Sequence, residues 1–268
     1  MIPGYARIEA GRIVETRGDA RFFQAASLGK MVTAALALRH LDLDAPVATA
    51  TWTPPFDAAD ITIRDVLMHR AGLSVPDYPG REPDAPVPTL AQSLDGIGAP
   101  GPLRRTGPNG RFAYSGGGYT WLQLAIEETA GRSFDDLVRE WDLWANPTGL
   151  SCETGHDAAG NSLPFYRYDG AAAGLLATPS AFARFMIDAP LAHLAEATIE
   201  TGGVDGLWPR YGLGVEIDNG VIGHHGINRG WRALAAFDPA TRDGLVLFAN
   251  RDGAEAELED AYRAWRRR

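Results

Sequence analysis

Ser27 and Lys30 stand three residues apart at the start of an apolar stretch that runs from Met31 to Leu41. Residues three apart on a helix return to one face, so a helix beginning here brings a hydroxyl and an amine within reach of each other. A serine hydroxyl becomes a useful nucleophile only when a base takes its proton. A lysine amine is such a base only where burial or nearby positive charge lowers its pKa. The alternative is structural, with Ser27 capping the helix and Lys30 in solvent.

Tyr114 is the second candidate, and it is followed by Ser115 and by glycines at 116–118. A phenol next to a lysine can share its proton and act as an acid or a base. The alternative is an aromatic anchor before a glycine-rich turn. The glycines also resemble a phosphate-binding loop, but no Gly-Lys-Ser/Thr follows them, so that interpretation is not favoured.

His224 and His225 form the third candidate, at the end of an expected strand and close to Gly223, Gly226 and Trp231. Adjacent residues of a regular strand point to opposite faces, so these two side chains should not line one site. The chain has no His-Glu-x-x-His pattern, and two histidines alone are a weak metal site, so we expect no metal. The glycines favour close backbone approach, as in an edge strand that holds a substrate. The alternative is a tight turn with exposed histidines.

The elements that must position these residues follow from hydrophobic periodicity and turn residues. Strands are expected at both ends of the chain and helices between them, which predicts an α+β fold with one antiparallel sheet made from both termini and flanked by helices. Residues 1–48 and 174–268 then form a sheet-containing lobe, and residues 49–173 an inserted, mainly helical lobe, with the site between them. The expected strands are 5–9, 12–16, 211–217, 220–224, 232–237 and 244–249; the expected helices are 27–41, 62–68, 119–129, one from 133, 179–188 and 254–267. Residues 74–111 read as a long irregular excursion, and such excursions are often functional.

The composition of the chain limits the classes of partner that it is expected to bind. The 268-residue chain carries a net charge of −9, which argues against nucleic acid or an anionic membrane surface. Its single cysteine, Cys152, excludes a disulfide within the chain. No stretch approaches the roughly 18 apolar residues of a membrane span, and the first residues lack the basic and apolar regions of a signal peptide. We therefore expect a cytoplasmic protein whose partner is a small molecule.

Taken together and in order, Ser27-Leu-Gly-Lys30, Tyr114-Ser-Gly and His224-His-Gly resemble the serine β-lactamase and penicillin-binding-protein superfamily. The resemblance is greatest to the class C β-lactamase-related branch, which includes esterases, D-amino-acid peptidases and amidases. Residues 63–73, Ile-Arg-Asp-Val-Leu-Met-His-Arg-Ala-Gly-Leu, are similar to the family's Leu-Leu-x-His-x-Ser-Gly-Leu segment. In this segment we expect His69 to be structural, fixing the loop by hydrogen bonding. The resemblance extends from about residue 22 to 248 and implies the β-lactamase/transpeptidase fold.

The resemblance also implies a mechanism without a cofactor. Ser27 would attack a carbonyl and form an acyl-enzyme, while Lys30 and Tyr114 exchange the proton and deliver it to the leaving group. Backbone N–H groups of Ser27 and Ile227 would form the oxyanion hole. Water or another acceptor would then release the acyl group. The residues expected to contact the substrate are His224, Gly226, Gly116 and Trp231, and His224 would either help to place the substrate or tune Tyr114. Trp231, Trp208 and Tyr211 are candidates for the pocket wall, with the core as the alternative.

Two departures from the family pattern narrow the substrate. Gly116 stands where relatives usually have an asparagine that holds the substrate's amide. His224 and His225 replace a Lys-Thr pair, so the permanent cation that pairs with a β-lactam carboxylate is lost. Both changes argue against efficient β-lactam hydrolysis and favour a small ester or amide. The alternatives are a D-amino-acid peptidase or amidase, an acyltransferase that differs only in the acceptor, and an inactive relative that binds a ligand or partner.

Overall fold

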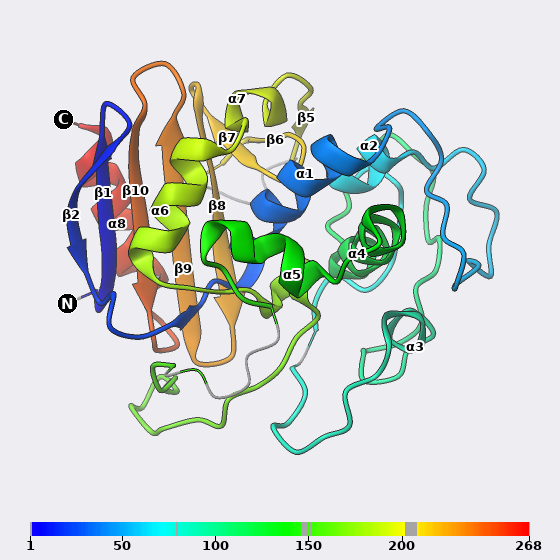
Figure 1. Ribbon diagram of the computed structural model, residues 1–268, viewed down its shortest axis with the longest axis horizontal. Helices are drawn as coiled ribbons and strands as arrows, with labels where there is room; N and C mark the ends of the chain where they lie inside the picture. Colours follow the sequence, from blue (N-terminus) through cyan, green and yellow to red (C-terminus); the bar gives the residue numbers. More distant parts are fainter. Residues whose placement is uncertain (1, 79, 146–149, 151, 202–207, 268) are drawn as a thin grey trace.

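The computed structural model describes residues 2–78, 80–145, 150, 152–201 and 208–267. Their main feature is an antiparallel sheet of eight strands in the order β2-β1-β10-β9-β8-β7-β6-β5. β1 (Gly4–Glu9) pairs with β2 (Arg12–Arg17) on one side and with β10 (Asp243–Ala249) on the other. The two ends of the chain therefore share one sheet, as the sequence predicts (Figure 1).

The half of the sheet beyond β10 contains strands from the last third of the chain. These are β9 (Trp231–Asp238), β8 (Val221–Asn228), β7 (Glu216–Asp218), β6 (Arg210–Tyr211) and β5 (Ile199–Glu200). The single strand expected over residues 211–217 is wrong, because the chain turns between β6 and β7. Gly214 has a φ of +69° there, and a Cβ on it would lie 2.7 Å from the carbonyl oxygen of Lys30. β8 also runs four residues further than expected, so it reaches the site.

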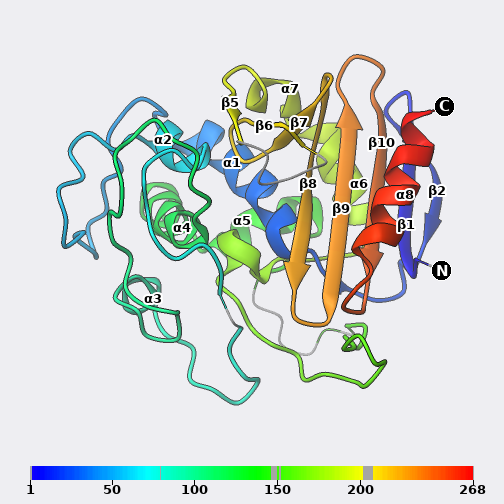
Figure 2. The ribbon, with the colours of Figure 1, turned by 180° about the vertical axis from the view of Figure 1, so that it is seen from behind.

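Helices cover both faces of the sheet (Figures 1 and 2). α8 (Glu255–Arg266) packs on β9 and β10 through Leu258 and Tyr262. On the opposite face, α6 (Pro179–Asp188) begins at the N-cap Thr178 and packs on β1, β2 and β10. α1 (Gly29–His40) packs against α4 (Gly116–Ala130), and its residues 29–37 are all buried. A polar side chain in this part of α1 is therefore removed from water.

Shorter elements complete the arrangement. Beyond the far edge of the sheet lie α2 (Ile63–Leu67) and α3 (Leu90–Leu94), while α5 (Phe134–Val138) packs against α4. The others are α7 (Leu191–Leu194), a short pair of strands β3 (Phe23–Gln24) and β4 (Leu176–Ala177), 3₁₀ turns at Ala26–Leu28 and Arg139–Trp141, and a π-helical turn at Gly170–Gly174. No helix in the described part of the chain is long and apolar enough to cross a bilayer.

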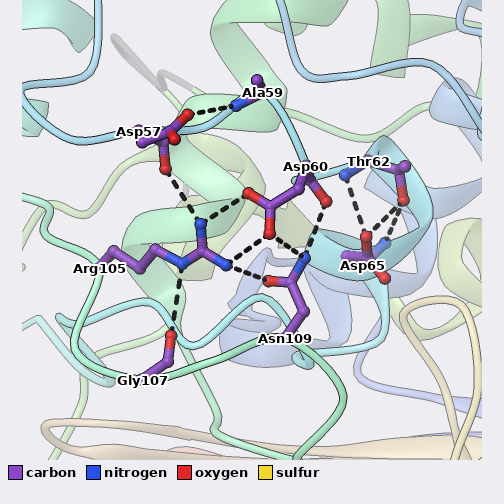
Figure 3. A network of polar contacts seen from close by, with 8 residues as sticks. All are labelled: Asp57, Ala59, Asp60, Thr62, Asp65, Arg105, Gly107 and Asn109. Atoms are coloured by element: carbon purple, nitrogen blue, oxygen red, sulfur yellow. Dashed lines mark hydrogen bonds and ion pairs between the residues drawn. The ribbon is translucent and has the colours of Figure 1, made fainter.

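The irregular excursion over residues 74–111 has a fixed course despite its lack of periodicity. Near its end, the Arg105 guanidinium donates to both carboxylate oxygens of Asp60, at 2.6 and 2.7 Å. The Asn109 amide donates to the Asp60 carbonyl oxygen at 2.8 Å (Figure 3). These contacts attach the excursion to the loop before α2, whose first turn is closed by a capping box between Thr62 and Asp65.

Candidate active site

Ser27 lies in the 3₁₀ turn that joins β3 to α1. The residue before it, Ala26, has a φ of +48°, a conformation that costs a non-glycine residue on the order of 1 kcal/mol or more. The Ser27 side chain does not cap the helix, since α1 has no side-chain hydrogen bond at its N-terminus. The capping role considered from the sequence is therefore wrong, and the hydroxyl is available to other side chains.

Lys30 lies in the first turn of α1 with only 1% of its surface exposed. Its Nζ donates to Ser27 Oγ at 3.1 Å and to the carbonyl oxygen of Ala172 at 2.6 Å. Burial lowers the pKa of this amine to about 7, although the negative charges of Asp77 and Glu216 raise it. The alternative of a solvated lysine is wrong, and the amine titrates in the range that a general base needs.

Tyr114 approaches Ser27 from the other side. Its hydroxyl donates to Ser27 Oγ at 3.0 Å, and Lys30 Nζ lies 4.9 Å from the centre of its ring. Burial raises the pKa of the phenol well above its usual value, and the Ser27 hydrogen bond opposes this only partly. The phenol is therefore protonated at neutral pH. Ser27 Oγ thus contacts one group that can accept a proton and one that can donate one.

The glycines after Tyr114 form the first turn of α4, so the helix begins three residues before the expected Tyr119 and the alternative of a glycine-rich turn is wrong. Ser115 is the N-cap, and its Oγ accepts from the Gly118 N–H at 3.0 Å. The N–H of Gly116 donates to the Pro76 carbonyl oxygen at 3.0 Å. A Cβ at Gly117 would lie 2.9 Å from the Cβ of Val75. The helix start therefore packs backbone against backbone on the beginning of the 74–111 excursion.

His69 holds the segment that carries Tyr114, which fits the structural role expected for it. Its carbonyl oxygen accepts from Ala113 N–H at 2.7 Å, and its Nδ1 accepts from Ser115 N–H at 3.0 Å. Its ring centre lies 4.1 Å from that of Tyr114. Burial lowers the pKa of His69 well below its usual value, so the ring is neutral and Nδ1 can accept. His69 thus holds the residues directly before and after Tyr114 by hydrogen bonds, and its ring packs against the Tyr114 ring.

The end of β8 passes very close to the turn that carries Ser27. A Cβ at Gly226 would lie 2.7 Å from the carbonyl oxygen of Ala25 and 3.0 Å from the Cβ of Ala26. Only a residue without a side chain permits this approach. Asn228, two residues later, donates its buried amide to Gln24 Oε1 at 2.7 Å and to the Ala173 carbonyl oxygen at 3.0 Å. β8 is therefore fixed against Ser27 at two points.

These segments enclose one pocket with a volume of about 690 Å³. Ser27 and Lys30 line it together with Gly116 and Ile227, all of which the sequence assigns to the site. The other lining residues come from the 74–111 excursion, from residues 158–173, from the end of β8 and the turn after it, from β9, and from the segment between β10 and the start of α8: Pro76, Asp77, Tyr78, Ala158, Tyr168, Ala172, Ala173, Asn228, Arg229, Arg232, Asp252, Gly253 and Glu255. The volume is ordinary for a small-molecule site.

A family model described as beta-lactamase matches residues 3–267. The chain belongs to the beta-lactamase family. Its similarity to penicillin-binding protein 4* of Bacillus subtilis (strain 168) is 31% identity over 147 residues, which are 51% of this chain and 31% of that protein. The matched region thus spans about a third of the length of this curated relative.

Solved structures of the same fold agree with this membership. The D-amino acid amidase from Ochrobactrum anthropi SV3, in complex with L-phenylalanine, matches with a TM-score of 0.73 at 19% identity, over 93% of this chain and 88% of that one. The octameric penicillin-binding protein homologue from Pyrococcus abyssi also matches with a TM-score of 0.73 at 19% identity, over 94% and 70% of the two chains. They establish the β-lactamase/transpeptidase fold predicted from the sequence.

The two histidines of this beta-lactamase-family chain meet at one carboxylate, contrary to expectation. His224 is fully buried and His225 is half-buried, as alternation predicts, yet the Nδ1 atoms of both lie near Glu216 Oε1, at 3.3 and 2.6 Å. Glu216 is on β7, opposite Gly223, and therefore lies beside both. Ligand atoms of the three side chains lie within 4.8 Å of one another. The 2.6 Å contact is a hydrogen-bond distance, shorter than the roughly 3.3 Å between ligands of a tetrahedral ion.

His224 lies behind the pocket rather than in its lining. Its Nε2 is 2.9 Å from the Tyr211 hydroxyl, and its ring centre lies 6.4 Å from that of Tyr114. Burial lowers the pKa of His224 well below its usual value, so it brings no positive charge at neutral pH. The expectation that His224 contacts substrate is corrected, while its place behind Tyr114 remains.

The tryptophans expected at the pocket pack elsewhere. Trp231 is 1% exposed, and its ring meets that of Phe23 edge to face at 6.2 Å. Trp208 is fully buried and packs against Tyr262 of α8, with ring centres 5.0 Å apart. Tyr211 is also buried, with its ring 4.9 Å from that of His69. The alternative of core residues is the correct one for all three, and Trp231 is withdrawn as a substrate contact.

Most of the other pocket-lining residues were missed by the sequence analysis, and three residues at or behind the pocket show why. The Ala172 carbonyl holds Lys30, but it arrives through a π-helical turn that apolar Gly and Ala residues do not indicate. Asp77 lines the pocket from an irregular segment, where an isolated acidic residue has no pattern around it. Asp169 is buried with Arg81 at 2.9 Å and accepts from Thr120 of α4 at 3.1 Å. The Pro-Gly-rich composition of 74–111 pointed to the region, without naming a residue.

Proposed function

We propose that this protein is a serine hydrolase that cleaves a small ester or amide through an acyl-Ser27 intermediate. One observation carries the proposal: Ser27 Oγ lies within hydrogen-bond distance of both the Lys30 amine and the Tyr114 hydroxyl. A lysine with a pKa of about 7 is a general base at neutral pH. A binding protein has no need of a buried lysine placed against a serine.

The proposed reaction proceeds in two halves. Lys30 in its neutral form takes the Ser27 proton as Oγ bonds to the substrate's carbonyl carbon. The proton then passes, directly or through the Tyr114 hydroxyl, to the leaving oxygen or nitrogen as its bond to carbon breaks. Water next attacks the acyl carbon, the same groups return the proton to Ser27 Oγ, and the acid is released.

The oxyanion of each half-reaction is assigned to the backbone N–H groups of Ser27 and Ile227. Both residues line the pocket, and the close approach at Gly226 brings their segments together. Backbone donors held in place before the reaction begins are worth about 10²–10³ in rate each. The strain at Ala26 is consistent with a backbone held for this purpose.

The absence of a side chain at Gly116 supports an ester or amide rather than a β-lactam. A Cβ there would lie 3.3 Å from the Tyr78 ring, so this aromatic ring takes the space beside the position where relatives have an amide. An acyltransferase would use the same acyl-enzyme with another acceptor, and product analysis with added alcohol or amine separates the two.

A fluorophosphonate probe and p-nitrophenyl acetate test the proposal. The wild type should be labelled at Ser27 and should hydrolyse the ester. Ser27→Ala should abolish labelling and lower turnover on the order of 10³-fold or more. Ser162→Ala, at an exposed serine away from the pocket, should change neither. Labelling that persists in Ser27→Ala, or a wild type that neither labels nor turns over, contradicts an acyl-Ser27 mechanism.

A further inference from the structure

Two side chains of opposite charge line the pocket without an ion-pair partner among the described residues. Asp77 is exposed and belongs to the 74–111 excursion beside Tyr78 and Gly116. Arg229 is exposed and directly follows β8, on the sheet side of the same pocket. The two come from different walls, and no ion pair joins them. Ser27 lines the same pocket.

The other charged side chains that line the pocket already have partners within the protein. Arg232 Nη1 lies 2.8 Å from Asp252, and its Nε lies 2.5 Å from Glu255. Lys30 is bound to Ser27 and to a backbone carbonyl. Asp77 and Arg229 form no ion pair with any residue that the structure describes, so a charged ligand entering this pocket can pair with both.

Arg229 is held in position although its side chain is exposed. Its guanidinium carbon lies 4.5 Å from the centre of the buried Tyr166 ring, a cation–π arrangement. Its backbone N–H donates to the Tyr168 hydroxyl at 3.3 Å, and the next N–H, of Gly230, donates to Asp252 at 2.8 Å. A guanidinium laid on a rigid ring loses less freedom on binding a carboxylate than a free one does.

Arg229 also provides a cation in a pocket where His224 replaces the lysine of relatives. Arg229 is two residues beyond Ile227, in the turn that joins β8 to β9. The pocket therefore keeps a permanent cation, which comes from the turn after β8 and not from the strand itself.

We propose, on the basis of the proposed function, that the substrate is a small zwitterion: an amide or ester whose ammonium group pairs with Asp77, whose carboxylate pairs with Arg229, and whose carbonyl carbon lies at Ser27. An unblocked dipeptide with small side chains has this arrangement of charges. Cleavage breaks its C–N bond, leaves the acyl group on Ser27 Oγ, and transfers the serine proton to the departing amine.

Such a substrate would also assist its own cleavage. The Asp77 charge raises the pKa of Lys30. An ammonium group placed on Asp77 neutralises that charge, so a larger fraction of Lys30 is the free base when the zwitterion is bound than when a neutral ester is bound. This adds a difference in rate to the difference in affinity.

Binding to the Ser27→Ala protein tests the proposal without catalysis. The ligands are alanyl-alanine of each configuration, its N-acetyl and C-amide derivatives, and the doubly blocked compound, with affinities from calorimetry. A charge-assisted hydrogen bond at a partly exposed site corresponds to about 10-fold or more in affinity. We expect one zwitterion to bind about 10-fold more tightly than either singly blocked form. Equal affinities, or no binding of any zwitterion, overturn the proposal.

Charge-removing variants assign the two groups. In the Ser27→Ala background, Asp77→Asn should remove the advantage of the free ammonium and keep that of the carboxylate, and Arg229→Gln should do the reverse. Asp84→Asn and Arg104→Gln, at exposed residues of the same excursion that do not line the pocket, should alter neither preference. A preference that survives both pocket variants contradicts the assignment.

Kinetics of the wild type separate this inference from the proposed function. If Ser27 is labelled by the fluorophosphonate but the blocked and free dipeptides react at equal kcat/KM, the hydrolase stands and the zwitterion pocket fails. If Ser27 is not labelled while the binding preference holds, the pocket stands and the acyl-enzyme fails.

Discussion

At the scale of single residues, the chemistry depends on how the protein keeps Lys30 neutral. Its amine is enclosed by the Tyr114 and Tyr119 rings, with Nζ 4.9 and 5.2 Å from their centres, and these rings favour the charged form. Burial favours the neutral form and is the larger effect, because the pKa of Lys30 falls to about 7. The negative charge of Asp77 keeps the pKa from falling further. The pKa of the base is thus set by a balance between burial and the two carboxylates of Asp77 and Glu216.

This balance predicts the pH dependence of turnover. Lys30 must lose its proton to act as the base, so kcat/KM for uncharged p-nitrophenyl acetate should rise with pH, with a midpoint of about 7. Asp77 raises that pKa by stabilising the cation, so Asp77→Asn should lower it and move the rising limb to lower pH. Lys30→Arg, charged at every accessible pH, should be inactive across the profile.

The matched control is Asp84→Asn, which removes an exposed carboxylate of the same excursion and should leave the limb in place. If the rising limb of the pH profile moves to higher pH in Asp77→Asn, or lies at the same pH as in the wild type, a group other than Lys30 limits the reaction.

At the scale of elements, the site depends on the contact between β8 and the turn of Ser27. Gly226→Ala places a Cβ 2.7 Å from the Ala25 carbonyl oxygen, so strand and turn must separate. A misplacement of about 1 Å costs on the order of 100-fold in rate. We expect that loss in kcat/KM with the circular dichroism spectrum unchanged, since β8 keeps its pairing with β9. Gly101→Ala, where a Cβ meets nothing within 4 Å, should retain activity; wild-type activity in Gly226→Ala would contradict this role.

Elements with a local signal were predictable from the sequence. Ser27 and Lys30 are three residues apart, so the 3₁₀ turn and the first turn of α1 that follows it fix their relation locally. The sheet follows from short apolar runs at both termini. The predictions that failed concern contacts between residues distant in sequence. Glu216 contacts both histidines only because the chain turns after β6, and this turn sets the register of β7 against β8. The Ala172 carbonyl reaches Lys30 only through a π-helical turn, which no periodicity marks.

At the scale of the whole molecule, two irregular segments close the pocket by binding each other. Arg81 of the 74–111 excursion and Arg167 exchange two backbone hydrogen bonds of 2.8 Å. The Arg81 guanidinium then reaches the buried Asp169 carboxylate at 2.9 Å. Asp169 also accepts from Thr120 of α4, whose hydroxyl is 2.8 Å from that of Tyr78 in the pocket wall. A buried ion pair therefore connects the wall that carries Asp77 to the turn that carries Ala172.

The last prediction concerns this ion pair. Arg81→Ala leaves the Asp169 carboxylate buried without its cation, which typically costs about 3–5 kcal/mol in the free energy of unfolding, measured by urea denaturation. Replacing both members, as Arg81→Met with Asp169→Leu, should recover much of that stability because no charge remains buried. Arg104→Ala, at an exposed arginine of the same excursion, should change it little. The double variant should still have a raised KM, since the wall loses the bond from Asp169 to Thr120; a wild-type KM would show that the wall is held by the backbone alone.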